Sequence, residues 1–249
     1  MNRLKVAAQL IIWGDETRTN LRGVLEEVRG AGYEGIEASP EVVVGNPTMV
    51  RELLRKNNLK LVALHMGVGD LEKSEQALKV LGDYGGEYLT FSGPGGRGTD
   101  ADYQNCAKFL NEIGRRSKEY GVRICYHNHG HEISENQRGI RMILEATDPE
   151  VVGLCVDTYW VKFGGSDPLR FLEENRSRVG YLHLKDGSEE DMKNRRFCEL
   201  GKGSIDFPAV LRFAVEEGLS WVVVEQDWTS GSPYSSMAES RDYLRRLGY

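Results

Sequence analysis

The sequence lacks the features that mark secreted, disulfide-stabilised or membrane-spanning proteins. Its 249 residues include only four cysteines, none in a Cys-x-x-Cys spacing, so neither a disulfide framework nor a cysteine zinc site is indicated. No apolar run approaches the roughly 20 residues that a membrane span requires, and residues 1–5 lead into no signal-peptide core. We therefore expect a cytoplasmic protein with no membrane partner.

The chain also lacks an excess of basic residues. It has 32 Lys+Arg against 38 Asp+Glu, a formal net charge of -6, and no Lys- or Arg-rich run. Proteins that neutralise many phosphates normally carry such an excess. We therefore expect no nucleic-acid partner.

The sequence does contain a regular alternation of short β-rich apolar runs and longer segments with helical spacing. The expected strands span residues 6–13, 33–39, 59–65, 88–92, 122–128, 151–157, 179–185 and 221–226. The expected helices span residues 19–30, 48–57, 71–84, 102–120, 137–146, 168–175, 207–217 and 235–247. Strict alternation of this kind predicts a parallel sheet with helical crossovers.

The length of the chain favours a closed barrel. Eight units in 249 residues leave about 31 residues per unit, which suits a (β/α)8 barrel. We therefore predict an α/β fold in which residues 1–249 form one (β/α)8 barrel domain. An open, doubly wound sheet is the structural alternative.

A glycine-rich stretch at residues 93–98 follows the fourth expected strand. Backbone N–H groups in such a loop can bind a phosphate. The stretch lacks the Gly-Lys-Ser/Thr ending of a P-loop, so a flexible loop is the alternative interpretation.

Ionisable side chains stand at the C-terminal ends of the expected strands, where (β/α)8 barrels carry their active sites. An unpaired charge is costly to bury, so apolar runs that repeatedly end in such groups indicate a functional site. The residues in question are Glu37, His65, His127, His129, Asp157, His183 and Glu225.

Three of these residues come from consecutive strands and can meet at one ion. Asp157, His183 and Glu225 are each separated by one βα unit, and neighbouring strands lie about 5 Å apart. Two carboxylates and one imidazole suit Mn²⁺, Mg²⁺, Co²⁺ or Zn²⁺. The alternative for any one of them is a buried polar group with satisfied hydrogen bonds.

The fifth expected strand offers several candidates for a fourth ligand. His127 and His129 are two residues apart and point the same way on a continuing strand, and Glu132 follows after a short loop. Any of the three can complete the site. A surface histidine tract is the alternative interpretation.

These segments resemble the xylose-isomerase-like barrels. That group includes sugar phosphate isomerases/epimerases, ketose 3-epimerases, inosose dehydratases and enzymes acting on 3-keto-glycosides. The matching segments are YHNHGHE at 126–132, VGLCVDTYW at 152–160, YLHLKD at 181–186, ELGKGSIDF at 199–207 and VVEQD at 223–227. The resemblance extends over essentially the whole chain.

The resemblance implies one divalent metal ion held by Glu, Asp, His and Glu. Asp157, His183 and Glu225 match the last three positions, whereas His127 stands where ketose 3-epimerases carry the first glutamate. We expect Glu132 to reach back as the fourth ligand. A histidine ligand, with a different acid/base pair, is the alternative. The group's barrels often pair, so homo-oligomers are compatible with the resemblance.

The resemblance implies a small, sugar-like substrate and chemistry at a carbonyl. We predict a metal-dependent isomerase or epimerase that acts on a sugar, keto-sugar or sugar phosphate through an enediolate. A lyase or dehydratase acting on an inosose or 3-keto-glycoside is the alternative, because both reactions share that intermediate. Glu225 is the first candidate base, and His127 or His129 the second.

Other side chains at this end of the barrel are expected to contact the substrate. They are Glu37, His65, Trp160 and Lys185. Lys185 follows His183 by two residues and can neutralise an oxyanion, or alternatively form a salt bridge with Asp186. The aromatic ring of Trp160 can pack against the apolar face of a sugar ring.

Two other classes of function compete with this prediction. An apurinic-site endonuclease on the same barrel is disfavoured by the net charge of -6 and by the presence of only five histidines. A non-catalytic accessory or sugar-binding subunit would keep the barrel, and turnover of a keto-sugar would exclude it.

Overall fold

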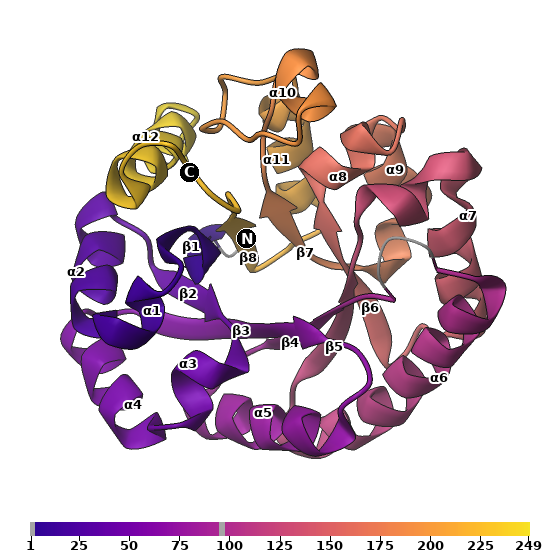
Figure 1. Ribbon diagram of the computed structural model, residues 1–249, viewed down its shortest axis with the longest axis horizontal. Helices are drawn as coiled ribbons and strands as arrows, with labels where there is room; N and C mark the ends of the chain where they lie inside the picture. The colour runs from indigo at the N-terminus through magenta and orange to yellow at the C-terminus, as the bar shows by residue number, and fades with distance from the viewer. Residues whose placement is uncertain (1–2, 95–97) are drawn as a thin grey trace.

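Eight parallel strands close into a barrel in this computed structural model, which describes residues 3–94 and 98–249 (Figure 1). The strands are β1 (Lys5–Gln9), β2 (Gly35–Ala38), β3 (Lys60–Gly67), β4 (Tyr88–Ser92), β5 (Arg123–His127), β6 (Val152–Asp157), β7 (Val179–Leu184) and β8 (Trp221–Val224). Each strand pairs with the next, and β8 pairs with β1 through Val6 and Val222. The predicted (β/α)8 barrel is confirmed, and the open sheet is excluded by the closing β1–β8 pair.

Helices surround the barrel (Figure 1). The longer ones are α2 (Leu21–Ala31), α4 (Pro47–Lys56), α5 (Leu71–Tyr84), α6 (Asp100–Ser117), α7 (Gly130–Ala146), α11 (Phe207–Glu216) and α12 (Pro233–Arg246). The shorter ones are α1 (Glu16–Thr19), α3 (Pro40–Val44), α8 (Thr158–Phe163), α9 (Pro168–Glu174) and α10 (Glu189–Lys193), with 3₁₀ turns η1 (Leu10–Trp13), η2 (Lys118–Tyr120) and η3 (Arg176–Arg178). None of the described helices is both long and apolar enough to cross a membrane.

The start of α2 shows how local sequence sets these helices. The Asn20 side chain accepts a hydrogen bond from the Gly23 N–H at 3.3 Å and so caps the helix N-terminus. At the other end Gly32 has φ 91°, in the left-handed region where glycine is favoured. Between the caps, apolar residues at helical spacing face the barrel.

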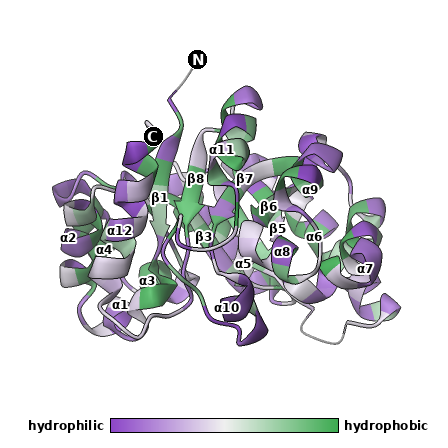
Figure 2. Cartoon of the chain, turned by 90° about the horizontal axis from the view of Figure 1, so that it is seen from above, coloured by the Kyte–Doolittle hydropathy of each residue, from purple (hydrophilic) through white to green (hydrophobic). Residues whose placement is uncertain are grey.

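The hydrophobic core has two layers. The barrel interior is filled by a cluster that includes Tyr88, Tyr181, Trp221 and the two buried thiols Cys125 and Cys155. A larger layer packs between the outer faces of the strands and the helices. In Figure 2 the strands are mainly green, whereas the outer helices carry much of the purple, as this arrangement requires. The filled interior leaves the strand ends as the place for a site.

The first strand is shorter than predicted. We expected a strand over residues 6–13, but β1 ends at Gln9 and Leu10–Trp13 forms η1. The Gln9 side chain accepts a hydrogen bond from the Ile11 N–H at 2.6 Å and starts the 3₁₀ turn. A short apolar run does not by its periodicity distinguish a buried strand from a buried helical turn.

Two further expectations concern loops. The helix expected at 137–146 begins earlier, because residues 130–133 form the first turn of α7, which has non-helical backbone at residues 134–137. The predicted phosphate-binding loop at 93–98 falls partly on residues 95–97, which lie outside the described residues.

Candidate metal centre

Four buried side chains converge at the C-terminal ends of β5, β6, β7 and β8. His127 ends β5, Asp157 ends β6, His183 lies in β7, and Glu225 follows β8 directly. Their ligand atoms all lie within 4.8 Å of one another. Pairing places Asp157 opposite His183, and the Glu225 N–H donates to the Leu184 carbonyl at 3.0 Å. Parallel register therefore brings residues nearly 100 positions apart into one cluster.

The separations within the cluster suit a bound cation. The His127 Nε2 atom lies 3.4 Å from Asp157 Oδ2 and 3.7 Å from Glu225 Oε2. The His183 Nδ1 atom is in direct contact with Glu225 Oε2. Oxygen and nitrogen ligands bind such ions at about 2.0–2.2 Å, which places neighbouring ligand atoms roughly 3–4 Å apart.

Hydrogen bonding gives an independent indication of the same site. His127 Nε2, Asp157 Oδ2, His183 Nδ1 and Glu225 Oε2 are all buried and have no hydrogen-bond partner among the described residues. Leaving one buried polar group unsatisfied costs about 1–3 kcal/mol, and more if it is charged. Four such atoms aimed at one point fit a divalent ion, since a cation satisfies lone pairs that no donor reaches. This cluster could therefore hold a metal ion.

Asp157 is held in place from both sides. Its Oδ1 atom accepts a hydrogen bond from the Trp160 N–H at 2.8 Å and caps α8, which leaves Oδ2 for the cluster. Its backbone N–H donates to Asn128 Oδ1 at 3.0 Å, and the Asn128 amide donates back to the Asp157 carbonyl at 3.3 Å. Neither the helix-capping role of Asp157 nor the contribution of Asn128 was predicted from the sequence.

Glu132, which we expected as the fourth ligand, lies outside this cluster. Its Oε1 atom accepts a hydrogen bond from Tyr126 at 2.6 Å, and its Oε2 atom accepts the His129 N–H at 2.8 Å. His131 Nε2 lies 3.0 Å from Oε1. Glu132 occupies the third position of α7, where glutamates commonly bond back to the helix start. That spacing was visible in the sequence.

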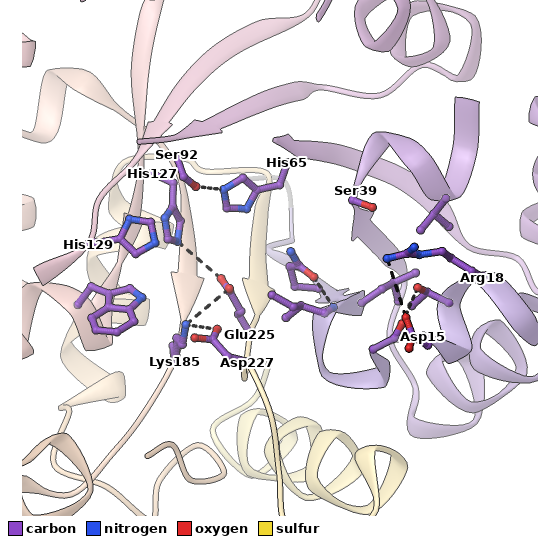
Figure 3. A pocket seen from close by; sticks show the side chains of 17 residues that line it. Asp15, Arg18, Ser39, His65, Ser92, His127, His129, Lys185, Glu225 and Asp227 are labelled. Carbon is purple, nitrogen blue, oxygen red and sulfur yellow. Dashed lines mark hydrogen bonds and ion pairs between the residues drawn. The ribbon is translucent and has the colours of Figure 1, made fainter. Parts of the chain in front are cut away.

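A second cluster forms the neighbouring wall from β2 and β3. Glu37 is fully buried, with Oε2 3.0 Å from His183 Nε2 and Oε1 3.2 Å from His65 Nδ1. Burial alone would raise the pKa of Glu37, but the charge of His183 and hydrogen bonds from both histidines lower it to about 2. Glu37 is therefore an anion held between two imidazoles. His65 Nε2 contacts the Ser92 hydroxyl (Figure 3).

Lys185 is a buried cation beside the four-residue cluster. Its Nζ atom lies 3.6 Å from Glu225 Oε1 and 3.7 Å from Asp157 Oδ2, and it contacts Asp227 directly (Figure 3). Burial opposes the charged form, but these three carboxylates raise the pKa of Lys185. The pKa of Asp227 is raised to about 6, first by its own burial, and Lys185 opposes that rise. Asp227 was not singled out from the sequence, although it lies in the segment at 223–227.

The alternative pairing of Lys185 with Asp186 is wrong. Both Asp186 carboxylate oxygens accept backbone N–H groups, at 2.9–3.2 Å, from Gly187, Gly201, Gly203 and Ser204. Asp186 therefore organises the loop after β7 and faces away from the cluster, whereas Lys185 points the other way as strand alternation requires.

A cleft of about 430 Å³ opens over the cluster and is wide enough for a small ligand. His65, His127, His129, Trp160, Lys185 and Glu225 line it. The ring centroids of His129 and Trp160 lie 5.6 Å apart, and the Lys185 ammonium lies 5.2 Å from the Trp160 ring centroid. Burial lowers the pKa of His129 to about 3, so this imidazole is neutral. The cleft thus combines a ring surface with polar groups that converge on the cluster.

Comparison with known proteins places the chain in a family. The sequence profile described as xylose isomerase-like TIM barrel matches residues 25–247. The chain belongs to this family. The resemblance drawn from the strand-end segments is thereby confirmed.

Relatives within the family carry several activities. The chain is 27% identical to an inosose dehydratase of Mesomycoplasma hyopneumoniae over 99% of this chain and 97% of that protein. Among solved structures, a sugar phosphate isomerase/epimerase from Parabacteroides distasonis has a TM-score of 0.81 at 19% identity, covering 98% of this chain and 94% of that one. A 3-keto-D-glucoside 4-epimerase from E. coli has a TM-score of 0.77 at 18% identity, covering 98% and 100%. These two structures share the fold of this chain.

Proposed function

We propose that the chain is a divalent-metal-dependent enzyme that removes a proton next to the carbonyl of a keto-sugar or ketocyclitol. The observation that carries this proposal is the set of four buried, unsatisfied ligand atoms under the cleft. The proposed ligands are His127, Asp157, His183 and Glu225, with His127 in the place we had assigned to Glu132. Bound there, Mn²⁺, Mg²⁺, Co²⁺ or Zn²⁺ would polarise a substrate carbonyl and acidify the adjacent C–H bond.

Glu225 is the proposed general base. It lines the cleft, and its pKa lies well below the ordinary value because Lys185 and His183 counter the effect of burial. It is therefore ionised and able to accept a proton. Lys185, beside Glu225 Oε1, is placed to stabilise the negative charge that builds on the substrate oxygen. Trp160 supplies a surface for the apolar face of a ring.

The fate of the intermediate depends on the group that returns a proton. Return of the proton by Glu225 to the adjacent carbon would give an isomer. An epimer needs a proton delivered to the opposite face of the same carbon, and the low pKa of His129, the second candidate base, makes it a poor donor. His127 replaces the first glutamate of ketose 3-epimerases, so Glu225 is the only carboxylate in the cluster that is placed to act as base. A reaction with two glutamate bases is therefore not proposed.

Dehydration is the second candidate, and the position of Lys185 favours it. Glu225 and Lys185 both line the cleft, and Glu225 Oε1 lies 3.6 Å from Lys185 Nζ. Glu225 takes the proton from carbon, the C–H electrons form a C=C bond, and the C–O bond breaks as Lys185 protonates the departing hydroxyl to give water. The full-length match to a protein named inosose dehydratase supports a ketocyclitol substrate for this reaction.

The proposal is tested by incubating the protein and Mn²⁺ with a panel of keto-sugars and inososes, followed by NMR and mass spectrometry. A product of unchanged mass would indicate isomerisation or epimerisation, and loss of one water would indicate dehydration. Glu225→Gln should abolish conversion. Glu41→Gln should not, since Glu41 is exposed on α3 and lies outside the cleft lining. Conversion by the Glu225→Gln variant at the wild-type rate would contradict the proposal.

A further inference from the structure

Glu37 lies at the centre of a buried hydrogen-bond network on the β2–β3 wall. Its Oε2 atom accepts a hydrogen bond from the Tyr181 hydroxyl at 2.7 Å and lies 3.0 Å from His183 Nε2. Its Oε1 atom lies 3.2 Å from His65 Nδ1 and 3.0 Å from His183 Nε2, whose hydrogen bond goes to Oε2. Three donors on one side chain require a carboxylate, because an ionised glutamate only accepts hydrogen bonds.

This network fixes which His183 nitrogen carries the proton. The Nε2 atom faces Glu37, so it must carry the proton and donate it. The Nδ1 atom is then the one left to bind a metal ion, and it is the unsatisfied atom that points at the four-residue cluster. A histidine that binds a metal through one nitrogen commonly donates its other N–H to a carboxylate.

The same argument sets the direction of hydrogen bonding toward the cleft. If His65 donates from Nδ1 to Glu37, its Nε2 atom is an acceptor. The Ser92 hydroxyl, which contacts that Nε2 atom, must then be the donor (Figure 3). Ser92 lines the cleft and would present its oxygen lone pairs to a ligand.

We propose that Glu37 is a positioning residue that holds His183 and His65 in opposite tautomers, one for the metal centre and one for the cleft. His183 keeps Nδ1 free as a ligand, and His65 keeps Nε2 free, so that Ser92 faces the substrate as an acceptor. Such an oxygen pairs with a hydroxyl of the substrate and repels a carboxylate or phosphate. The inference rests on the proposed metal-dependent reaction and narrows its substrate at this point to a neutral polyol.

A competing interpretation is a second metal ion bound by Glu37, His65 and His183, whose ligand atoms also converge. Of the atoms that bring Glu37, His65 and His183 together, only Glu37 Oε1 is buried without a hydrogen-bond partner among the described residues. In the four-residue cluster, all four ligand atoms lack a partner. His183 Nε2 and His65 Nε2 are already paired, with Glu37 and Ser92. A proton on His65 Nδ1 satisfies the one remaining oxygen, so no second ion is required.

The experiment is a two-bond ¹H–¹⁵N correlation spectrum of protein labelled with ¹⁵N-histidine, recorded without metal and with Zn²⁺. The chain has only five histidines, and His65→Gln and His183→Gln assign the two signals. We expect His65 to be protonated on Nδ1 in both spectra, and zinc-bound His183 to be protonated on Nε2 alone. In Glu37→Gln we expect mixed tautomers and a loss of zinc affinity of about 10–100-fold. Glu41→Gln is the matched control and should match the wild type in both measurements.

The outcomes separate this inference from the proposed function. His65 protonated on Nε2 would overturn the inference, as would two zinc ions per chain by elemental analysis. The spectrum of the unmodified protein decides this even if Glu37→Gln fails to fold. If zinc does not bind at all, the proposed metal centre fails, yet the His65 tautomer in the metal-free spectrum still decides whether Glu37 sets the direction of hydrogen bonding.

Discussion

A metal ion that binds the four-residue cluster must stabilise the folded chain, because the unfolded chain does not assemble the ligands. Binding to the native state alone adds RT ln(1 + [L]/Kd), which is about 2.7 kcal/mol when the free ion is at 100 times its Kd. For a chain of 249 residues, 1 kcal/mol shifts the melting temperature by about 2–4 °C. We therefore expect the melting temperature of metal-free protein to rise by about 5–11 °C at that concentration.

The cluster also supplies the variant that tests this shift and a matched control. His127→Gln removes the Nε2 atom that lies 3.4 Å from Asp157 and 3.7 Å from Glu225. Each tenfold rise in Kd removes about 1.4 kcal/mol, or about 3–6 °C of the shift. His131→Gln alters a neighbouring histidine outside the cluster and should keep the full shift.

The assay is differential scanning fluorimetry of protein stripped with a chelator, then titrated with Mn²⁺, Mg²⁺, Co²⁺ or Zn²⁺. Two results would refute the reasoning. One is the absence of a shift with all four ions. The other is an equal shift in wild type and His127→Gln, which would mean that the ions bind elsewhere.

Three further predictions follow from the same contacts. Asp186→Ala should lower the free energy of unfolding in guanidinium by several kcal/mol, because it leaves the backbone N–H groups of Gly187, Gly201 and Gly203 without an acceptor; a change below about 1 kcal/mol would contradict this. Burial raises the pKa of Cys106, Cys155 and Cys198 to about 12, so iodoacetamide at pH 8 should label them only after unfolding, as peptide mapping would check. Trp160→Ala should raise KM for the substrate without lowering metal content by elemental analysis.

The barrel was predictable because its signal is local and repeated. Each strand is a short apolar run, and each connection contains apolar residues at helical spacing. The count of eight units follows from the alternation of these two patterns along the chain. The errors concern ends and short turns. Residues 10–13 are as apolar as a strand, but the capping hydrogen bond that the Ile11 N–H donates to the Gln9 side chain turns them into η1.

The candidate site was predictable only in part, for a physical reason. The sequence alone allowed Asp157, His183 and Glu225 to be assigned to one site, because parallel strands place their C-terminal ends at one edge of the sheet. The choice between His127 and Glu132 could not be made that way, since it depends on where side chains point. Glu132 turns toward Tyr126. The Glu37 network depends on contacts with Tyr181 and His183, which lie 144 and 146 positions further along the chain.

The most direct test of the proposed chemistry is incorporation of deuterium from D2O into a keto-sugar or inosose at the carbon next to the carbonyl. We predict that wild-type protein with Mn²⁺ catalyses this exchange or places deuterium in the product. Exchange should fall to background after chelation of the metal and in Glu225→Gln. Conversion without any C–H bond cleavage, or exchange that survives both chelation and Glu225→Gln, would contradict the account.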